Sequence, residues 1–362
     1  ILTQLSKFND LFVISRNSTF TYKGKATKAT DVARDLGVRY VVEGSVRKAG
    51  NRVRVTVQLI DGINDRHVWA DRYDRDLEDV FAIQDEITAA ITATLPGRVE
   101  ADSHDRARRK PTDNMQAYEC VLAGKVLHHR SKRTDNAEAL ALLERAIELD
   151  PKYAHARAWR ACVLGQAWIY GWNEDPDAML DAAVAELERA RALDENDADI
   201  HRILAAVYIT RNDFEKAQIH QNKSVKLNPN YDLAVVQQGE LMTWIGQPEE
   251  GVEWIKKAMQ LNPFHPLRFW SHLGRAYFAA RQYQEAIDAF KRIETLDQGQ
   301  HAFLGACYAY LENDDDAAKQ AQKVLALAPD FSAESYMAQM HYMKDADSLH
   351  LRDGLVKSGL PD

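Results

Sequence analysis

Val225-Lys-Leu-Asn-Pro229 and Met259-Gln-Leu-Asn-Pro263 are nearly identical phrases whose prolines lie 34 residues apart. Related phrases, Ile147-Glu-Leu-Asp-Pro151 and Val324-Leu-Ala-Leu-Ala-Pro329, lie two such intervals away to within ten residues. Each phrase follows a run with helical spacing, and proline cannot continue a helix, so each phrase predicts a helix end. A repeat of about 34 residues therefore organises the stretch from 116 to 330.

Each repeat contains two helical patterns. The first pattern is clearest where Ile200, Ile203, Leu204, Val207 and Tyr208 form one apolar stripe. Small residues recur in both helices at the same spacings of 34, 35 and 31, which predicts two antiparallel helices in close contact. They are Ala205, Gly239, Gly274 and Gly305 in the first helix, and Ala217, Gly251, Ala286 and Ala317 in the second.

Two helices in a unit of this length resemble the tetratricopeptide repeat (TPR) family, over about two thirds of the chain. The resemblance implies an all-α TPR superhelix over residues 113–362, with about six repeats and carboxyl-terminal capping helices. Residues 331–343 are expected to form one more first helix, and residues 345–359 its partner. One repeat is enlarged by ten residues around 168–176, where an aromatic cap and a binding ridge remain alternatives.

In this family the first helices line the concave face of the superhelix, where peptides bind. The matching positions predict a peptide-binding groove made of Arg202, Glu240, Trp244, Arg268, Arg275, Phe278 and Tyr310. Arginines beside aromatic residues suit an extended peptide or a helix that carries acidic groups. An ordinary solvated surface is the alternative for each residue. The family's full Lys and Asn clamp for a terminal carboxylate is not found.

The amino-terminal third has a mixed pattern. Residues 1–10 predict the tail of a helix, 11–15 a buried strand, and 17–27 a polar loop. A helix capped by Thr30 and closed by Gly37 follows. Strands are predicted at 40–46, 53–59 and 67–73, the first two as a hairpin, because Val53, Val55, Val57 and Leu59 alternate with polar residues. A long helix is predicted over 77–91.

Three stretches in this third, at 12–25, 36–47 and 67–74, resemble a TolB-type amino-terminal α/β module. The resemblance implies an α+β chain, with a TolB-like module at residues 1–100 that is truncated at its amino terminus. In bacteria this module is joined to TPR repeats, downstream of a class III adenylate/guanylate cyclase domain or of a winged-helix regulator domain. Residues 101–112 are a basic, polar linker, for which docking of an acidic partner is the alternative.

Composition narrows the possible functions. The 362 residues carry a net charge of −8, which argues against general nucleic-acid binding. The chain has no run of about 20 apolar residues and no signal peptide, and it does not begin with Met, so we expect a fragment of a longer protein. Cys120, Cys162 and Cys307 are expected to be small buried hydrophobic residues.

Catalytic motifs were not found, so we expect no catalytic residue, no cofactor and no metal site. His128 and His129 are adjacent on a helix and point apart, which makes them poor joint metal ligands. The segment 24–27 lacks a phosphate loop, and the acidic run 312–316 lacks the pattern of a calcium loop. An enzyme with a site near Glu43, Asp71 and Arg72 is a separate hypothesis.

The sequence therefore favours a non-catalytic regulatory and protein–protein interaction region of a bacterial signalling protein, most simply a class III nucleotide cyclase. The sensor or effector half of a winged-helix transcriptional regulator is the alternative. The expected partner is a protein or peptide in the TPR groove, with self-association possible, no nucleic acid and no membrane span. We expect a cytoplasmic region, or a periplasmic one if a membrane span lies upstream.

Overall fold

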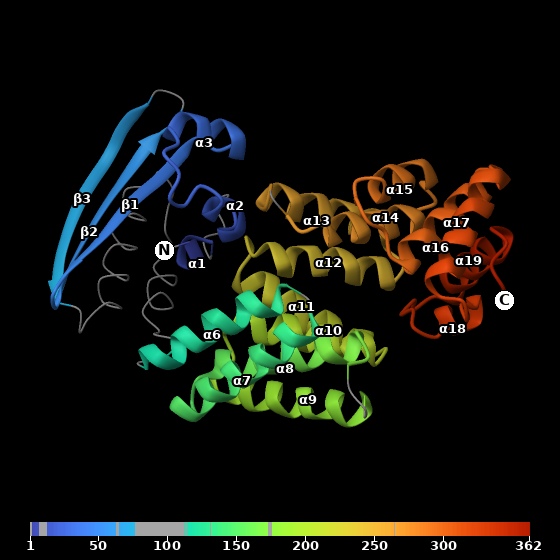
Figure 1. Cartoon of the computed structure of the whole chain (residues 1–362), viewed down its shortest axis with the longest axis horizontal. Coiled ribbons are helices and arrows are strands. Elements are labelled where there is room, and N and C mark those ends of the chain that lie inside the picture. Colours follow the sequence, from blue (N-terminus) through green and yellow to red (C-terminus); the bar gives the residue numbers. More distant parts are fainter. Residues whose placement is uncertain are drawn as a thin grey trace. The chain divides into compact units, whose positions relative to one another are not determined.

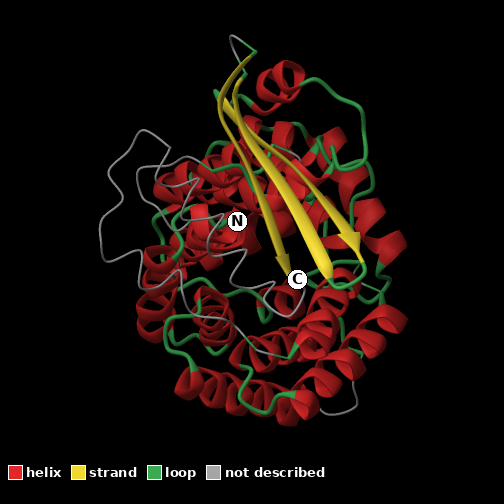
Figure 2. Cartoon of the chain, turned by 90° about the vertical axis from the view of Figure 1, so that its left-hand side faces the viewer, coloured by secondary structure: helices red, strands yellow, loops and turns green. Residues whose placement is uncertain are grey.

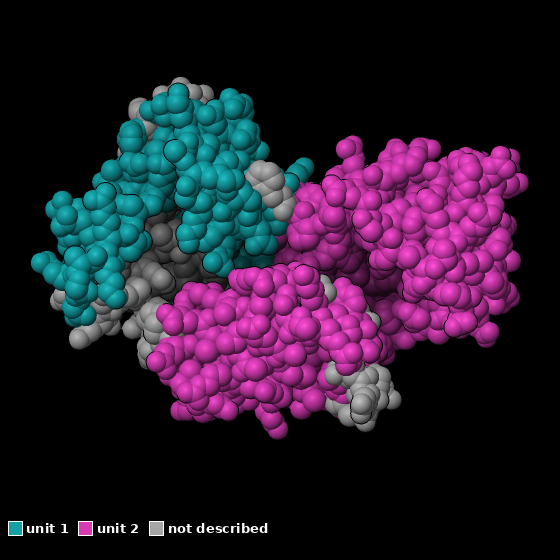
Figure 3. Space-filling view, in the orientation of Figure 1, with its two compact units in different colours: residues 1–113, 228–231, 260–264 teal, residues 114–227, 232–259, 265–362 magenta. Residues whose placement is uncertain are grey.

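The computed structural model divides into two compact units, which Figure 3 shows in different colours. Unit 1 contains residues 1–113 with the loops 228–231 and 260–264, and unit 2 contains the remainder. The described residues are 2–6, 13–62, 65–76, 112, 114–130, 132–172, 176–263 and 265–362. Of the helices searched in this described part, none combines the length and the low polarity needed to span a membrane.

A three-stranded antiparallel sheet dominates the described part of unit 1 (Figure 2). Its strands β1 (Tyr40–Ala49), β2 (Arg52–Asp61) and β3 (Arg66–Asp76) are neighbours in chain order. Gly50 has a φ of 62° in the β1–β2 turn, which a residue without a side chain adopts readily. Val53, Val57 and Leu59 are buried, so the predicted hairpin, the third strand and the alternation of β2 are confirmed.

The helices of unit 1 differ from the prediction. Residues 13–15, expected in a strand, have no regular structure, and α2 (Arg16–Phe20) replaces part of the expected loop. The Ser15 side chain caps α2 by accepting from the Ser18 amide, which explains its start. Helix α3 (Ala29–Leu36) begins after Lys28, not Thr30, and closes at Gly37 as predicted. Helix α1 spans Leu2–Leu5. The continuation of this helix predicted beyond Ser6 lies outside the described residues, as does the helix predicted over 77–91.

Unit 2 consists of helix pairs, as the repeat pattern predicted. First helices of the repeats are α6 (Met115–His128), α8 (Ala154–Ile169), α10 (Ala198–Thr210), α12 (Asp232–Trp244), α14 (Arg268–Ala279) and α16 (Gln298–Tyr310). Second helices are α7 (Arg133–Leu149), α9 (Pro176–Leu193), α11 (Phe214–Leu227), α13 (Pro248–Leu261), α15 (Tyr283–Phe290) and α17 (Asp314–Leu327). Two further helices, α18 (Ala333–Met337) and α19 (Asp345–Lys357), follow (Figure 1).

Small residues hold the paired helices together where the sequence predicted. A side-chain carbon added at Gly239 in α12 would lie 2.6 Å from the Gly251 carbonyl oxygen of α13. One added at Gly274 in α14 would lie 2.7 Å from the Phe290 ring of α15. Neither position has room for a larger residue, because interiors are close-packed. The prolines also act as predicted: Asp150 and Ala328, each before a proline, are not helical and end their helices.

The enlarged repeat lengthens both of its helices. Helix α8 has 16 residues where α10 has 13, and α9 has 18 where α11 has 14. The link 170–175 has six residues where the link 211–213 has three, so the ten additional residues are divided among the three segments. Tyr170 and Trp172 stack at 4.8 Å in this link.

The helix predicted over 331–343 is only five residues long. Helix α18 ends at Met337, and residues 340–344 are not helical before α19 begins at Asp345. A helix would have placed Tyr336, Met340 and Met343 on one face. The structure instead exposes Met343 and packs Tyr342 against the core, so tertiary burial overrides the local pattern.

Candidate functional site

The first helices of unit 2 form a continuous row. Helix α6 packs on α8, α8 on α10, α10 on α12, α12 on α14, and α14 on α16. Figure 1 shows the last members of the row, α12, α14 and α16, in succession. Side chains that leave these helices on the same side therefore gather from several repeats, and the predicted groove residues all lie on them.

A charged cluster around one tryptophan joins three neighbouring first helices. We define the Trp159 cluster as Lys125 of α6, His155 and Trp159 of α8, and Asp199 and Arg202 of α10. Trp159 is fully buried, and its indole N–H donates to Asp199 at 3.0 Å. The Lys125 ammonium lies 4.3 Å from the indole centroid, within reach of a cation–π attraction. Arg202 donates to the other Asp199 oxygen at 3.0 Å.

Three side chains here have the composition of a metal site: His155, Asp197 and Asp199, whose ligand atoms lie within 4.8 Å of one another. They do not fit a metal ion, because the ammonium group of Lys125 already lies beside His155 and Asp199. Lys125 Nζ lies 3.3 Å from His155 Nε2 and 3.8 Å from an Asp199 oxygen. The other His155 nitrogen is 2.6 Å from Asp197. The ammonium therefore takes the place that a metal ion would need.

Two histidines border the cluster. The rings of His128 and His129 lie 5.6 and 5.7 Å from the Trp159 ring. Burial, followed by the charges of Arg202 and Arg268, lowers the pKa of His128 to about 4. Burial and the neighbouring His128 lower the pKa of His129 to about 3, with Arg268 acting in the same direction. Both rings are therefore neutral at pH 7, beside cations that Asp199 partly balances.

Of the predicted groove residues, Arg202 belongs to the Trp159 cluster, and the charge of Arg268 lowers the pKa of both histidines that border it. Arg268 is exposed at the start of α14, and Arg202 is largely buried. Of the others, Glu240 lies 3.5 Å from His272. The Arg275 guanidinium lies 5.6 Å from the Phe303 ring centroid.

The three aromatic residues of the predicted groove are covered by the carboxyl-terminal part of the chain. Trp244 and Phe278 are 5% and 1% exposed, so neither side chain lines an open groove. Trp244 packs on the rings of His341 and Tyr342, and Phe278 on that of His350. Tyr310 stacks on His350 at 4.2 Å and donates its hydroxyl to the His350 carbonyl at 2.7 Å.

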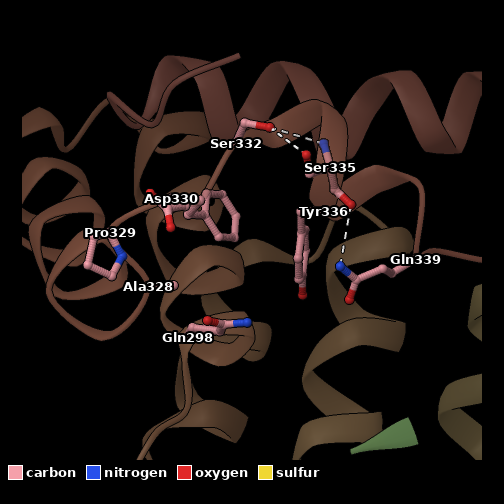
Figure 4. A pocket seen from close by; sticks show the side chains of 9 residues that line it. Gln298, Ala328, Pro329, Asp330, Ser332, Ser335, Tyr336 and Gln339 are labelled. Atoms are coloured by element: carbon pink, nitrogen blue, oxygen red, sulfur yellow. Dashed lines mark hydrogen bonds between the residues drawn. The ribbon is translucent and has the colours of Figure 1, made fainter. Parts of the chain in front are cut away.

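A small cavity of about 250 Å³ lies beside α18 (Figure 4). It is smaller than most ligand pockets, and part of its polar lining is engaged: Ser332 bonds to Ser335, and Gln339 donates to the Ser335 carbonyl. The lining residues are Gln298, Ala328, Pro329, Asp330, Phe331, Ser332, Ser335, Tyr336 and Gln339. We assign no ligand to it.

The hypothetical enzyme site in unit 1 does not form. Asp71 pairs with Val57 in the sheet, whereas Glu43 pairs with Gln58 and Arg72 with Thr56. Because neighbouring residues of a strand point to opposite faces, Asp71 lies across the sheet from Glu43 and Arg72. Glu43 instead accepts from Gln58 at 2.8 Å.

The described helix pairs define a tandem-repeat solenoid, a class of protein that presents extended surfaces to other proteins. Models of the tetratricopeptide repeat match residues 200–231 and 246–301 of this solenoid. Two solved structures are similar to the chain at low identity and with TM-scores below 0.5. They are the APC/C hetero-tetramer Cut9-Hcn1 (TM-score 0.48, 17% identity, covering 77% of this chain and 54% of that one) and the type IV pilus biogenesis factor PilW (0.47, 18%, 60% and 96%).

Curated relatives match parts of the chain. "Putative adenylate cyclase 3" of Rhizobium meliloti (strain 1021) is 39% identical over 205 residues, which are 57% of this chain and 35% of that protein. The chain thus spans about a third of the length of this relative. BBSome complex member BBS4 of Bos taurus is 27% identical over 149 residues, 41% of this chain and 28% of that protein.

Proposed function

We propose that this chain is the non-catalytic regulatory and protein-binding region of a bacterial signalling protein that also carries a class III adenylate or guanylate cyclase domain. The similarity to a protein named as an adenylate cyclase supports this assignment over the winged-helix alternative. In this proposal residues 1–100 are a TolB-like module that connects the cyclase domain to the repeats, and the region is cytoplasmic.

We further propose that the repeats bind an acidic protein segment at the Trp159 cluster. The observation that carries this proposal is that Lys125 and Arg202 lie together beside two neutral histidines, whose pKa values the charge of Arg268 also lowers. A carboxylate that enters this field gains charge-assisted hydrogen bonds, while the buried indole holds Asp199 through its N–H and attracts the Lys125 ammonium. Glu240 and Arg275 extend the proposed groove along α12 and α14.

The ligand proposal is tested with a fluorescein-labelled decapeptide of Glu and Ala, titrated into the complete chain and followed by anisotropy. Arg268→Glu combined with Arg202→Gln is expected to weaken binding about tenfold or more, which corresponds to about 1.4 kcal/mol. The matched control is Arg145→Glu on α7, whose guanidinium pairs with Glu148 on the surface. Equal affinity in all three proteins would contradict the site.

The signalling proposal is tested in the longer protein that contains this chain. We expect that protein to form a cyclic nucleotide from ATP or GTP, and deletion of these 362 residues to change its regulation while catalysis persists. The isolated chain is expected to turn over neither nucleotide. Turnover by the isolated chain, or no cyclic product from the longer protein, contradicts the assignment.

A further inference from the structure

The chain between α18 and α19 crosses the turns of three upstream repeats. We call residues 338–347 the strap. Its side chains meet the turn between the two helices of each repeat, at intervals of three strap residues. The contacts are His341 Nδ1 with Asn212 Oδ1 at 3.2 Å, Lys344 Nζ with the Gly246 carbonyl at 2.7 Å, and Asp347 with the Arg281 guanidinium at 3.1 Å.

The three turns have one geometry. Asn212, Gly246 and Arg281 all have a positive φ, of 56°, 79° and 63°, at equivalent positions 34 and 35 residues apart. We call these three turns the turn row. Packed helices lie about 8–10 Å apart, and three residues of extended chain span about 10 Å. The non-helical residues 341–344 therefore advance by three residues from the Asn212 turn to the Gly246 turn, and the first turn of α19 brings Asp347 to the Arg281 turn.

Backbone and apolar contacts add to this register. The Met343 amide donates to the Trp244 carbonyl at 2.8 Å, and the Tyr342 ring packs edge-on against the Trp244 ring at 4.8 Å. Met340 and Tyr342 pack against two core clusters at once, the one containing Trp244 and the one containing Phe278. The non-helical part of the strap thus binds in the manner of a peptide ligand, through a main-chain hydrogen bond and side-chain contacts.

The strap is an imperfect ligand of this surface. The Tyr342 hydroxyl is buried and has no hydrogen-bond partner among the described residues, which costs stability. Met343, Lys344 and Asp345 are exposed, so the ammonium bond to Gly246 is screened by water. A segment that makes the same contacts and leaves no buried hydroxyl without a partner can therefore compete with the strap.

We propose that the turn row is a second peptide-binding surface, which this chain closes with its own strap. The surface takes a protein segment that is non-helical at an aromatic residue and at a lysine two positions later, and that begins a helix with an acidic residue three positions after the lysine. The aromatic ring fills the place beside Trp244, the lysine binds the Gly246 carbonyl, and the acid pairs with Arg281. Displacement of the strap by such a partner segment opens the surface. This proposal does not depend on the acidic-peptide site.

The test uses a labelled peptide with the sequence of residues 338–348 and the complete chain. Lys344→Ala with Asp347→Ala loosens the strap without touching the turn row, and this variant is expected to bind the peptide at least tenfold more tightly than the wild type. A control peptide with alanine in place of Tyr342 and glutamate in place of Lys344 is expected not to bind. Adding Arg281→Ala to the loosened variant is expected to weaken binding of the native peptide again.

Three outcomes overturn the proposal: no binding to the loosened variant, equal binding to variant and wild type, or equal binding of the control peptide. If the double variant does not fold, the same peptide-binding comparison is made with Lys344→Ala alone, because this exposed side chain contributes little to the core. Acidic-peptide binding by the Trp159 cluster is measured in parallel, so that failure of one proposal is distinguished from failure of the other.

Discussion

The two ends of the first-helix row have the same helix pairs and opposite chemistry. At the amino-terminal end, Lys125 and Arg202 lie beside a buried tryptophan and two uncharged histidines. At the carboxyl-terminal end, Phe278 and Tyr310 are packed under α19. The scaffold therefore fixes where side chains gather, and the residues at each repeat decide whether the surface attracts an acidic ligand or binds another part of the chain.

Loss of packing beneath α19 should have the largest effect on stability. Phe278→Ala removes a fully buried ring that contacts Phe303, Tyr310 and His350, and is expected to lower the free energy of unfolding by about 3–5 kcal/mol. Tyr170→Ala, at a ring that is 53% exposed, is expected to cost less than about 1 kcal/mol. Urea unfolding followed by circular dichroism measures both, and similar midpoints would contradict the assigned burial.

Acid should lower the stability of the helices around the Trp159 cluster. Because the pKa of His128 falls from its ordinary 6.5 to about 4 on folding, the unfolded chain binds its proton first as the pH drops. Stability is therefore complete above about pH 6.5 and decreases towards pH 4, by roughly 3 kcal/mol for this group. His128→Gln with His129→Gln is expected to flatten that decrease in urea midpoints between pH 7 and pH 4.5. An unchanged slope would show that the rings are not buried in a positive field.

Asp199 balances the cations of the Trp159 cluster. Asp199→Asn keeps an acceptor for the Trp159 N–H but removes the charge that faces Lys125 and Arg202, which should cost about 1.5–3 kcal/mol of stability. The same change should increase affinity for the acidic decapeptide several-fold. Asp181→Asn, at a 76% exposed carboxylate paired with Arg211, is the control and should change neither. Lower peptide affinity in Asp199→Asn would contradict the electrostatic account.

The smallest effect is expected at the strap. Lys344→Ala should change the free energy of unfolding by no more than about 1 kcal/mol, because the lost bond is exposed. Hydrogen exchange at the Met343 amide should nevertheless accelerate, since that amide bonds to the Trp244 carbonyl. Lys319→Ala, which breaks the surface pair with Asp316, should leave this amide unchanged.

The periodic parts of the fold were predictable from sequence. Helix ends before Pro151 and Pro329, and close contacts at Gly239 and Gly274, follow from the chemistry of proline and glycine. The left-handed turn residues Asn212, Arg281 and Glu312 share no side-chain identity, so no residue pattern marks them. They become recognisable only as the position seven residues after each small residue of the first helix.

The site was predicted in part. The repeat pattern selected Arg202 and Arg268, but not Lys125 or Trp159, because a contact between α6, α8 and α10 depends on how the repeats stack. One signal was present: Asp199 and Arg202 are charged residues three apart in an otherwise apolar helix, and such residues require a buried partner. The covering of Trp244 by the strap and of Phe278 by α19 depends on where the carboxyl-terminal part of the chain runs, which local spacing does not encode.

Hydrogen exchange of the complete chain, with and without the acidic decapeptide, tests the contrast between the two ends most directly. The account predicts that the peptide slows exchange in α6, α8 and α10, around the Trp159 cluster, and leaves α16 and α19 unchanged. Protection confined to α16 and α19, or in the sheet strands β1 to β3 alone, would contradict it.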